Sequence, residues 1–221
     1  MTKTYESAAT QGFAARFRLY LALGIACVAI AGLFANYIVA YERENSHLYA
    51  AWTMIYYFTN TTGTLVLIIF AGIALAPNTW LRSWLVAGAS VAVLLVGVVQ
   101  YSFRASGPPL YGFEFTQDFL LHGVLPVAVP IFWLSFITKG NLKFWHALIW
   151  AAYPLIYIIF ILIHGATIGI YPYIFVDVSQ QGTISVVKTA VSITAIFMTA
   201  GFLLVGFDRL LGKRRPIVLP F

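Results

Sequence analysis

Long apolar stretches, separated by short polar segments, dominate the pattern of residues along the chain. Six of these stretches reach the roughly 20 residues that an α-helix needs to cross a bilayer. They are continuously apolar and not alternating, which favours helices over a β-barrel. We therefore expect an all-α integral membrane protein with a single domain (residues 1–221), a bundle of six transmembrane helices that span about residues 17–40, 50–75, 84–103, 116–138, 145–164 and 184–211.

Composition supports this reading and excludes several classes of function. The chain has 221 residues, of which 61% are hydrophobic and 9% charged, whereas about 25% of the residues of a soluble domain are charged. The single cysteine, Cys27, excludes a disulfide or a cysteine-based metal site within one chain. We expect no metal and no cofactor. The net charge of +6 does not indicate nucleic-acid binding, because the basic residues flank apolar stretches and form no single patch.

The distribution of Lys and Arg predicts the orientation in the membrane. Ten of the 13 basic residues flank the N-terminus, the second loop, the fourth loop or the C-terminus: Lys3, Arg16, Arg18, Arg82, Lys139, Lys143, Arg209, Lys213, Arg214 and Arg215. The positive-inside rule then places both termini in the cytoplasm. Arg43, Arg104 and Lys188 remain on the outer side. Arg104 and Lys188 are positioned either to hold a carboxylate headgroup or to extend to the membrane surface.

Polar side chains inside the predicted spans gather at one level. In the second span, Thr59 lies roughly 14 Å below the outer end, and in the fourth span His122 lies roughly 9 Å below it. Asn36, Gln100 and His164 also fall near the outer ends of their spans. Scattered polar residues would not share a level, so this clustering predicts a site in the outer half of the membrane.

Thr59 and His122 are the strongest candidates for chemistry. A threonine in a membrane helix commonly bonds the carbonyl four residues earlier, so Thr59 needs a base within reach to act as a nucleophile. His122 is that base by depth, although a lone histidine is as often a packing residue. Asp118 precedes His122 by four residues on the same helix face, where it would orient the imidazole as the acid of a serine triad does. Pro126 bends the same span and favours a cavity beside His122.

Other polar residues are expected to support this pair. Possible hydrogen-bond donors to a developing oxyanion are Asn36, Asn60, Gln100 and Tyr157. His164 shares a helix face with Tyr157 and is a further supporting candidate. The segment that follows, with Tyr171 and Tyr173, has the composition of an aromatic belt at the membrane interface.

Several short motifs resemble a known family. They are Tyr57-Phe58-Thr59, Leu121-His122 followed by Pro126, Trp150 followed by Pro154 and Tyr157, and Tyr171-Pro172-Tyr173 followed by Phe175 and Asp177. In this order and spacing they are similar to the androgen-inducible, FAR-17a-like family of multi-pass membrane proteins, in its bacterial branch. Animal members of that family are threonine hydrolases that cleave fatty acid esters of hydroxy fatty acids. The resemblance implies a bacterial inner-membrane protein with Thr59 as nucleophile and His122 as base.

We therefore expect an intramembrane lipid ester hydrolase, a threonine-dependent carboxylic ester hydrolase that acts on long-chain esters. Its ligands would be a lipid ester or a fatty acid, reached from the outer leaflet among membrane lipids, and nothing in the sequence predicts an oligomeric state. One alternative is a membrane protein that binds or transports a lipid or small molecule without turnover. A less favoured one is a haem protein with His122 and His164 as axial ligands.

Overall fold

The computed structural model describes the backbone of residues 2–104 and 109–213 and the side chains of residues 13–102 and 109–213. The side chains of Lys3 and Arg104, and all of Arg214 and Arg215, lie outside the described parts. Within them the chain forms helices and no strand. The elements are α1 (Thr2–Glu44), α2 (His47–Tyr56), α3 (Phe58–Leu75), α4 (Pro77–Trp80), α5 (Ser83–Arg104), α6 (Gly112–Asp118), the π-helical turn η1 (Phe119–Val124), α7 (Leu125–Phe136), α8 (Phe144–Ile168), the 3₁₀ turn η2 (Ile174–Val176), α9 (Val178–Gln181) and α10 (Thr183–Lys213).

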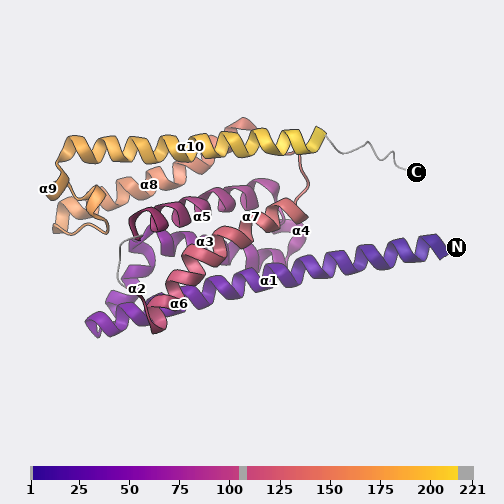
Figure 1. Ribbon diagram of the computed structural model, residues 1–221, viewed down its shortest axis with the longest axis horizontal. Helices are drawn as coiled ribbons and strands as arrows, with labels where there is room; N and C mark the ends of the chain where they lie inside the picture. Colours follow the sequence, from indigo (N-terminus) through magenta and orange to yellow (C-terminus); the bar gives the residue numbers. More distant parts are fainter. Residues whose placement is uncertain (1, 105–108, 214–221) are drawn as a thin grey trace.

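The predicted six-span helical bundle is confirmed. Six segments are long and apolar enough to cross a membrane: 13–44, 58–75, 83–102, 112–136, 144–168 and 183–213. They run alternately up and down, so that the N-terminal end of α1, α4 and the C-terminal end of α10 lie at one end of the bundle (Figure 1). The short elements α2, α6 and α9 lie at the other, which we call the α9 end. Which end of the bundle faces the cytoplasm stays a prediction from the positive-inside rule.

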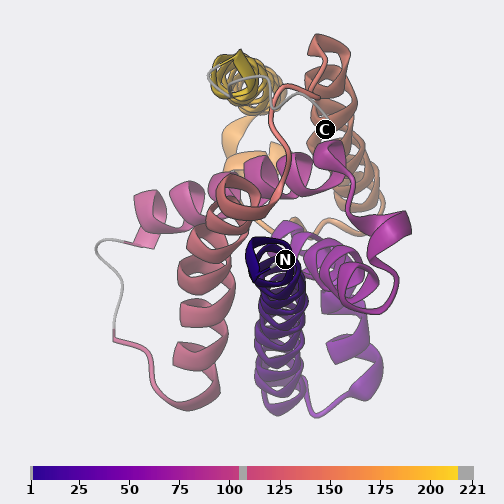
Figure 2. The same cartoon turned by 90° about the vertical axis from the view of Figure 1, so that its right-hand side faces the viewer.

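Helix α5 is central in the bundle and α10 is peripheral. Half of the most apolar window of α5 is buried inside the protein, against 17% of that of α10. Helix α3 packs along α1, and α10 packs along α8 and also touches α5. Seen from the end, α10 occupies one edge of the molecule, well away from α1 (Figure 2). The outer surface of α10 therefore suits contact with lipid acyl chains.

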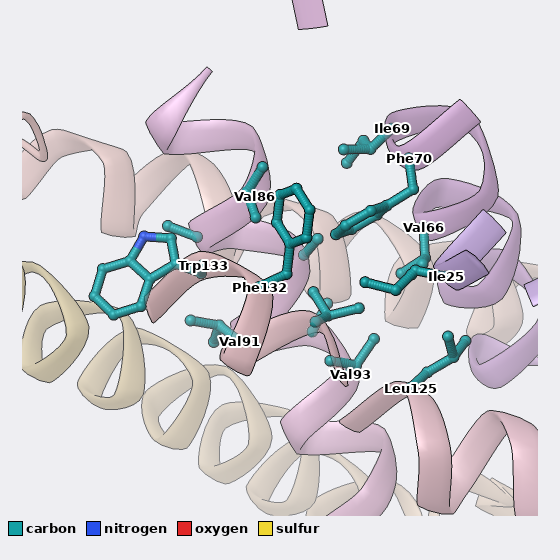
Figure 3. Close-up of a cluster of buried hydrophobic side chains, with 14 of the residues drawn as sticks. Ile25, Val66, Ile69, Phe70, Val86, Val91, Val93, Leu125, Phe132 and Trp133 are labelled. Atoms are coloured by element: carbon teal, nitrogen blue, oxygen red, sulfur yellow. The ribbon is translucent and has the colours of Figure 1, made fainter. Parts of the chain in front are cut away.

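An apolar core fills the half of the bundle nearer α4. It joins α1, α3, α5 and α7, and Figure 3 shows the rings of Phe70 and Phe132 facing each other within it. Their centroids are 5.0 Å apart with an interplanar angle of 76°, the edge-to-face arrangement that aromatic rings prefer. Both rings are almost fully buried. This core holds α3 and α7 together on the α4 side of the polar residues.

The sequence predicted one continuous helix over residues 50–75, and the structure differs. The chain breaks at Tyr57, which separates α2 from α3. This residue has extended backbone angles (φ −98°, ψ 134°) between α2 and α3. A break frees backbone groups that a membrane interior cannot hydrate. The Tyr157 hydroxyl donates to the Tyr56 carbonyl (2.8 Å), and the Tyr173 hydroxyl accepts from the Phe58 N–H (3.1 Å). Two distant tyrosines therefore hold the break and make Thr59 an N-terminal residue of α3.

The fourth apolar stretch is also irregular, at the position of its histidine. The turn η1 is π-helical, and it passes into α7 with the Leu125 N–H bonded to the Leu120 carbonyl, five residues back. Pro126 explains this locally, because it has no N–H to give to the His122 carbonyl in an α-helical ladder. Gly97 of α5 lies against this turn, where an added Cβ would come within 3.0 Å of Pro126. The small residue lets α5 approach the segment that carries His122.

Candidate active site

Thr59 and His122 face each other across the interface between α3 and η1. The Thr59 Oγ1 atom lies 3.1 Å from the His122 Nε2 atom, within hydrogen-bonding distance. His122 is buried, with 7% of its surface exposed. Thr64, one turn further along α3, instead donates to the Asn60 carbonyl in the way common for membrane threonines. The two residues singled out by depth are therefore brought together.

Asp118 lies behind the imidazole, as its spacing suggested. The Asp118 Oδ1 atom is 3.1 Å from His122 Nδ1, and the Gln100 side-chain amide donates to the same oxygen at 2.5 Å. A carboxylate beside Nδ1 favours the tautomer with its proton on that atom, which leaves Nε2 as the acceptor for the Thr59 hydroxyl. The geometry thus forms a hydroxyl–imidazole–carboxylate chain, with Gln100 of α5 holding the carboxylate.

A second polar chain lies beside the first and joins α1, α3 and α6. The Asn60 amide donates to Asn36 Oδ1 (3.0 Å) and to the Thr53 carbonyl (2.8 Å), and the Asn36 amide donates to Gln117 Oε1 (3.0 Å). Asn60 is 1% exposed. Since buried polar groups are costly unless paired, these bonds fix the relative positions of the three helices at the level of Thr59.

The four predicted oxyanion donors differ in whether they have an N–H or O–H that is not already donated to another group. Tyr157 has one O–H and gives it to the Tyr56 carbonyl, and Asn60 gives an N–H to each of two acceptors. Neither therefore has a proton to spare in this arrangement. Asn36 and Gln100 each make one of the two bonds that an amide nitrogen can donate. Their role as oxyanion donors stays a prediction.

Tyr173 and Gln117 belong to the site, although sequence reasoning did not place them there. Gln117 bonds Asn36, and the Tyr173 hydroxyl sits at the start of α3, one residue from Thr59. The Tyr173 ring is partly exposed, but its hydroxyl end is enclosed, and burial raises the pKa of that hydroxyl to about 12. Depth along the spans gave no signal for Tyr173, because it comes from the segment between α8 and α9. Whether Tyr173 also lies in an aromatic belt at the membrane interface stays a prediction.

Two cavities meet at the Thr59–His122 pair. An apolar cavity of about 80 Å³ lies among α3, α5, α8, α10 and η2. A polar cavity of about 260 Å³ lies toward α1, α2 and α6. Both are lined by the same four residues, which are Thr59, Gln100, His122 and Tyr173. The pair thus stands at a boundary between apolar and polar space.

His164 does not join this site. Its ring packs against Trp52 and Tyr56, with centroid distances of 5.0 and 5.1 Å, and it lines neither cavity. His122 and His164 therefore share neither of these two cavities, and a haem with both as axial ligands would have to lie between them. In the described residues no group of three or more His, Cys, Asp or Glu side chains could hold a metal ion.

Comparisons of the chain with models of known protein families, with curated proteins and with solved structures found no match. The family resemblance therefore remains a prediction carried by the short motifs.

Proposed function

We propose that this protein is an intramembrane lipid ester hydrolase that uses Thr59 as its nucleophile and His122 as its general base. The observation that carries the proposal is the 3.1 Å contact between Thr59 Oγ1 and His122 Nε2, with Asp118 at 3.1 Å from the other ring nitrogen. A neutral hydroxyl is a weak nucleophile and needs a base at this distance. The resemblance to the membrane threonine hydrolases supports the same two residues.

In the first half of the reaction, Thr59 Oγ1 attacks the ester carbonyl carbon while His122 Nε2 takes the hydroxyl proton. Asp118 stabilises the imidazolium that forms. The carbon–oxygen bond to the alcohol then breaks, and His122 gives the proton to the departing oxygen. The products of this half are a free alcohol and an acyl group esterified to Thr59. Asn36 and Gln100 are the candidates for stabilising the oxyanion, together with the N-terminal end of α3.

In the second half, water enters and completes hydrolysis. His122 removes a proton from the water, whose oxygen bonds to the acyl carbon, and the bond from that carbon to Thr59 Oγ1 breaks. The proton returns to Thr59, and a fatty acid leaves. We place the site toward the outer leaflet of a bacterial inner membrane, with both termini cytoplasmic. The substrates are fatty acid esters of hydroxy fatty acids or similar long-chain esters.

The test is hydrolysis of long-chain fluorogenic esters by the protein purified in detergent. Thr59→Ala and His122→Ala are compared with wild type, and Thr64→Ala is the matched control because its hydroxyl bonds only the backbone of its own helix. We expect losses of at least about 10³-fold in kcat/KM for the first two variants and little change for the control. A fluorophosphonate probe should label wild type and spare Thr59→Ala. Equal rates in wild type, Thr59→Ala and His122→Ala would refute the proposal.

The apolar cavity alone favours a second candidate function, the binding or transport of a lipid without turnover. It is lined by aliphatic and aromatic side chains of five elements, the composition of most small-molecule pockets. A lipid that copurifies with wild type and stays intact over hours, with equal occupancy in Thr59→Ala, would support this candidate.

A further inference from the structure

The polar cavity contains a feature that the proposed reaction does not use. Arg43, in the last turn of α1, is the charged residue among those that line this cavity, and no carboxylate side chain lines it. The cavity is also lined by neutral hydrogen-bonding side chains, among them Asn36, Tyr49 and Gln117, and by the apolar residues Val39 and Ala40. A cation surrounded by neutral donors suits an anionic ligand group.

Arg43 keeps its charge available on this side of the protein. Within the part of the chain whose side chains are described, no ion pair joins Arg43 to a carboxylate. Arg43 also lines a neighbouring cavity together with Glu42 and Glu114, neither of which lines the polar cavity. Lys188, predicted at the outer rim, lines neither the apolar nor the polar cavity. Of the cations expected on the outer side whose side chains are described, Arg43 is therefore the one that faces the site.

The order of the chemical steps indicates whether the acyl half or the alcohol half of the ester lies beside Arg43. The acyl group stays on Thr59 after the alcohol departs, and its chain needs the apolar cavity. Water must then reach the acyl carbon, and the polar cavity is the route whose walls can hydrate it. The alcohol must therefore occupy the polar cavity first and leave it before water enters.

We propose that Arg43 is a specificity-determining residue, which binds an anionic group, a carboxylate or a phosphate, on the alcohol half of the substrate ester. This inference rests on the proposed hydrolase function. Binding to Arg43 would hold the alcohol in the polar cavity while the acyl chain fills the apolar one. The ester carbonyl would then lie between them, beside Thr59.

Three decanoyl esters with closely related leaving groups test this: those of 4-hydroxybenzoate, of 4-hydroxybenzamide and of 4-hydroxyphenyl phosphate. The first and third carry an anion, and the second is neutral. Each is assayed with wild type, Arg43→Gln, Arg43→Lys and Lys188→Gln, the last being the matched control because Lys188 lies on the same side and lines neither cavity. The carboxylate and phosphate arms distinguish the two sources of the anion.

We expect Arg43→Gln to lower kcat/KM for an anionic ester by about 10- to 100-fold, chiefly through KM, as for loss of a hydrogen bond to a charged group. Hydrolysis of the neutral ester should change less than about twofold, and Arg43→Lys should restore part of the loss. A preference for one anionic ester identifies carboxylate or phosphate as the natural group. Lys188→Gln should behave as wild type.

The outcomes separate this inference from the proposed function. Thr59-dependent hydrolysis with equal effects of Arg43→Gln on neutral and anionic esters, or with none, would overturn the role of Arg43 and leave the hydrolase intact. Absence of Thr59-dependent hydrolysis of all three esters would overturn both.

Discussion

The two halves of the bundle are built on different principles. Toward the α9 end, helices are broken or underwound, and polar side chains join them by specific bonds such as those of Thr59, Asn60 and Asp118. Toward α4, the helices are joined by apolar packing, with Phe70 and Phe132 at its centre. Each polar bond at the α9 end requires particular partner atoms, whereas apolar packing tolerates exchange of similar shapes. The first half is suited to chemistry and the second to rigidity.

The largest effect, a loss of kcat, is expected when the charge of Asp118 at the α9 end is removed without a change in side-chain shape. Asp118→Asn keeps the size of the side chain beside His122 but removes the carboxylate that favours the reactive tautomer. We expect kcat to fall about 10²- to 10⁴-fold, as for the corresponding change in a serine triad. Thermal unfolding of the purified protein should change little. An Asp118→Asn variant with more than half of wild-type activity would show that the carboxylate is not part of the chemistry.

The next largest effect is expected in the apolar half of the bundle near α4, and it is an effect on stability and not on activity. Phe132→Ala opens a cavity beside Phe70, and in a membrane this loss is mainly one of van der Waals contact. We expect the free energy of unfolding, measured by titration with a denaturing detergent, to fall by about 2–4 kcal/mol. Activity per folded molecule at low temperature should stay near wild type. A large loss of activity in fully folded Phe132→Ala would contradict the separation of the two halves.

A smaller effect is expected at the helix break, where structure and chemistry meet. Tyr157→Phe removes the O–H that satisfies the Tyr56 carbonyl. Leaving a buried carbonyl unpaired costs about 1–3 kcal/mol, and because the break positions Thr59 we expect kcat to fall with stability. Detergent titration and ester hydrolysis on the same preparation would measure both. A loss of stability with unchanged kcat would show that the position of Thr59 does not depend on this bond.

The smallest effect is expected from Tyr153→Phe, the matched control for that variant on the same helix. The Tyr153 hydroxyl lies 2.9 Å from Thr61 Oγ1 and 3.0 Å from Thr62 Oγ1, outside the Thr59–His122–Asp118 chain. Its loss should cost about 0.5–1.5 kcal/mol of stability and leave kcat within about threefold. A greater effect on kcat than that of Tyr157→Phe would mean that the polar chain reaches further along α3 than the cavity geometry indicates.

The sequence was enough to predict the spans and the Thr59–His122 pair, because both follow from positions counted along the chain. Continuous apolarity gave the six helices, and depth along each helix paired Thr59 with His122. Asp118 followed from helical spacing. The irregular turn at His122 had a visible cause in Pro126.

The break at Tyr57 could not be predicted in the same way. No Gly or Pro lies within five residues of it in the sequence, and it is held by Tyr157 and Tyr173, about a hundred residues further along the chain. The same limitation hid Tyr173 and Arg43, because their relevance depends on which cavity they face. Partners distant in sequence decide these features, and a single sequence does not reveal them.

The tyrosines at the break also have a consequence for biogenesis. A membrane protein is inserted from its N-terminus onward, so α2 and α3 enter the bilayer well before α8 and the segment with Tyr173. Until those arrive, the Tyr56 carbonyl and the Phe58 N–H lack the partners that hold the break before Thr59. Thr59 is therefore set in its final position only after the C-terminal half has been inserted. A nascent or truncated chain would carry Thr59, His122 and Asp118 without the finished arrangement that joins them.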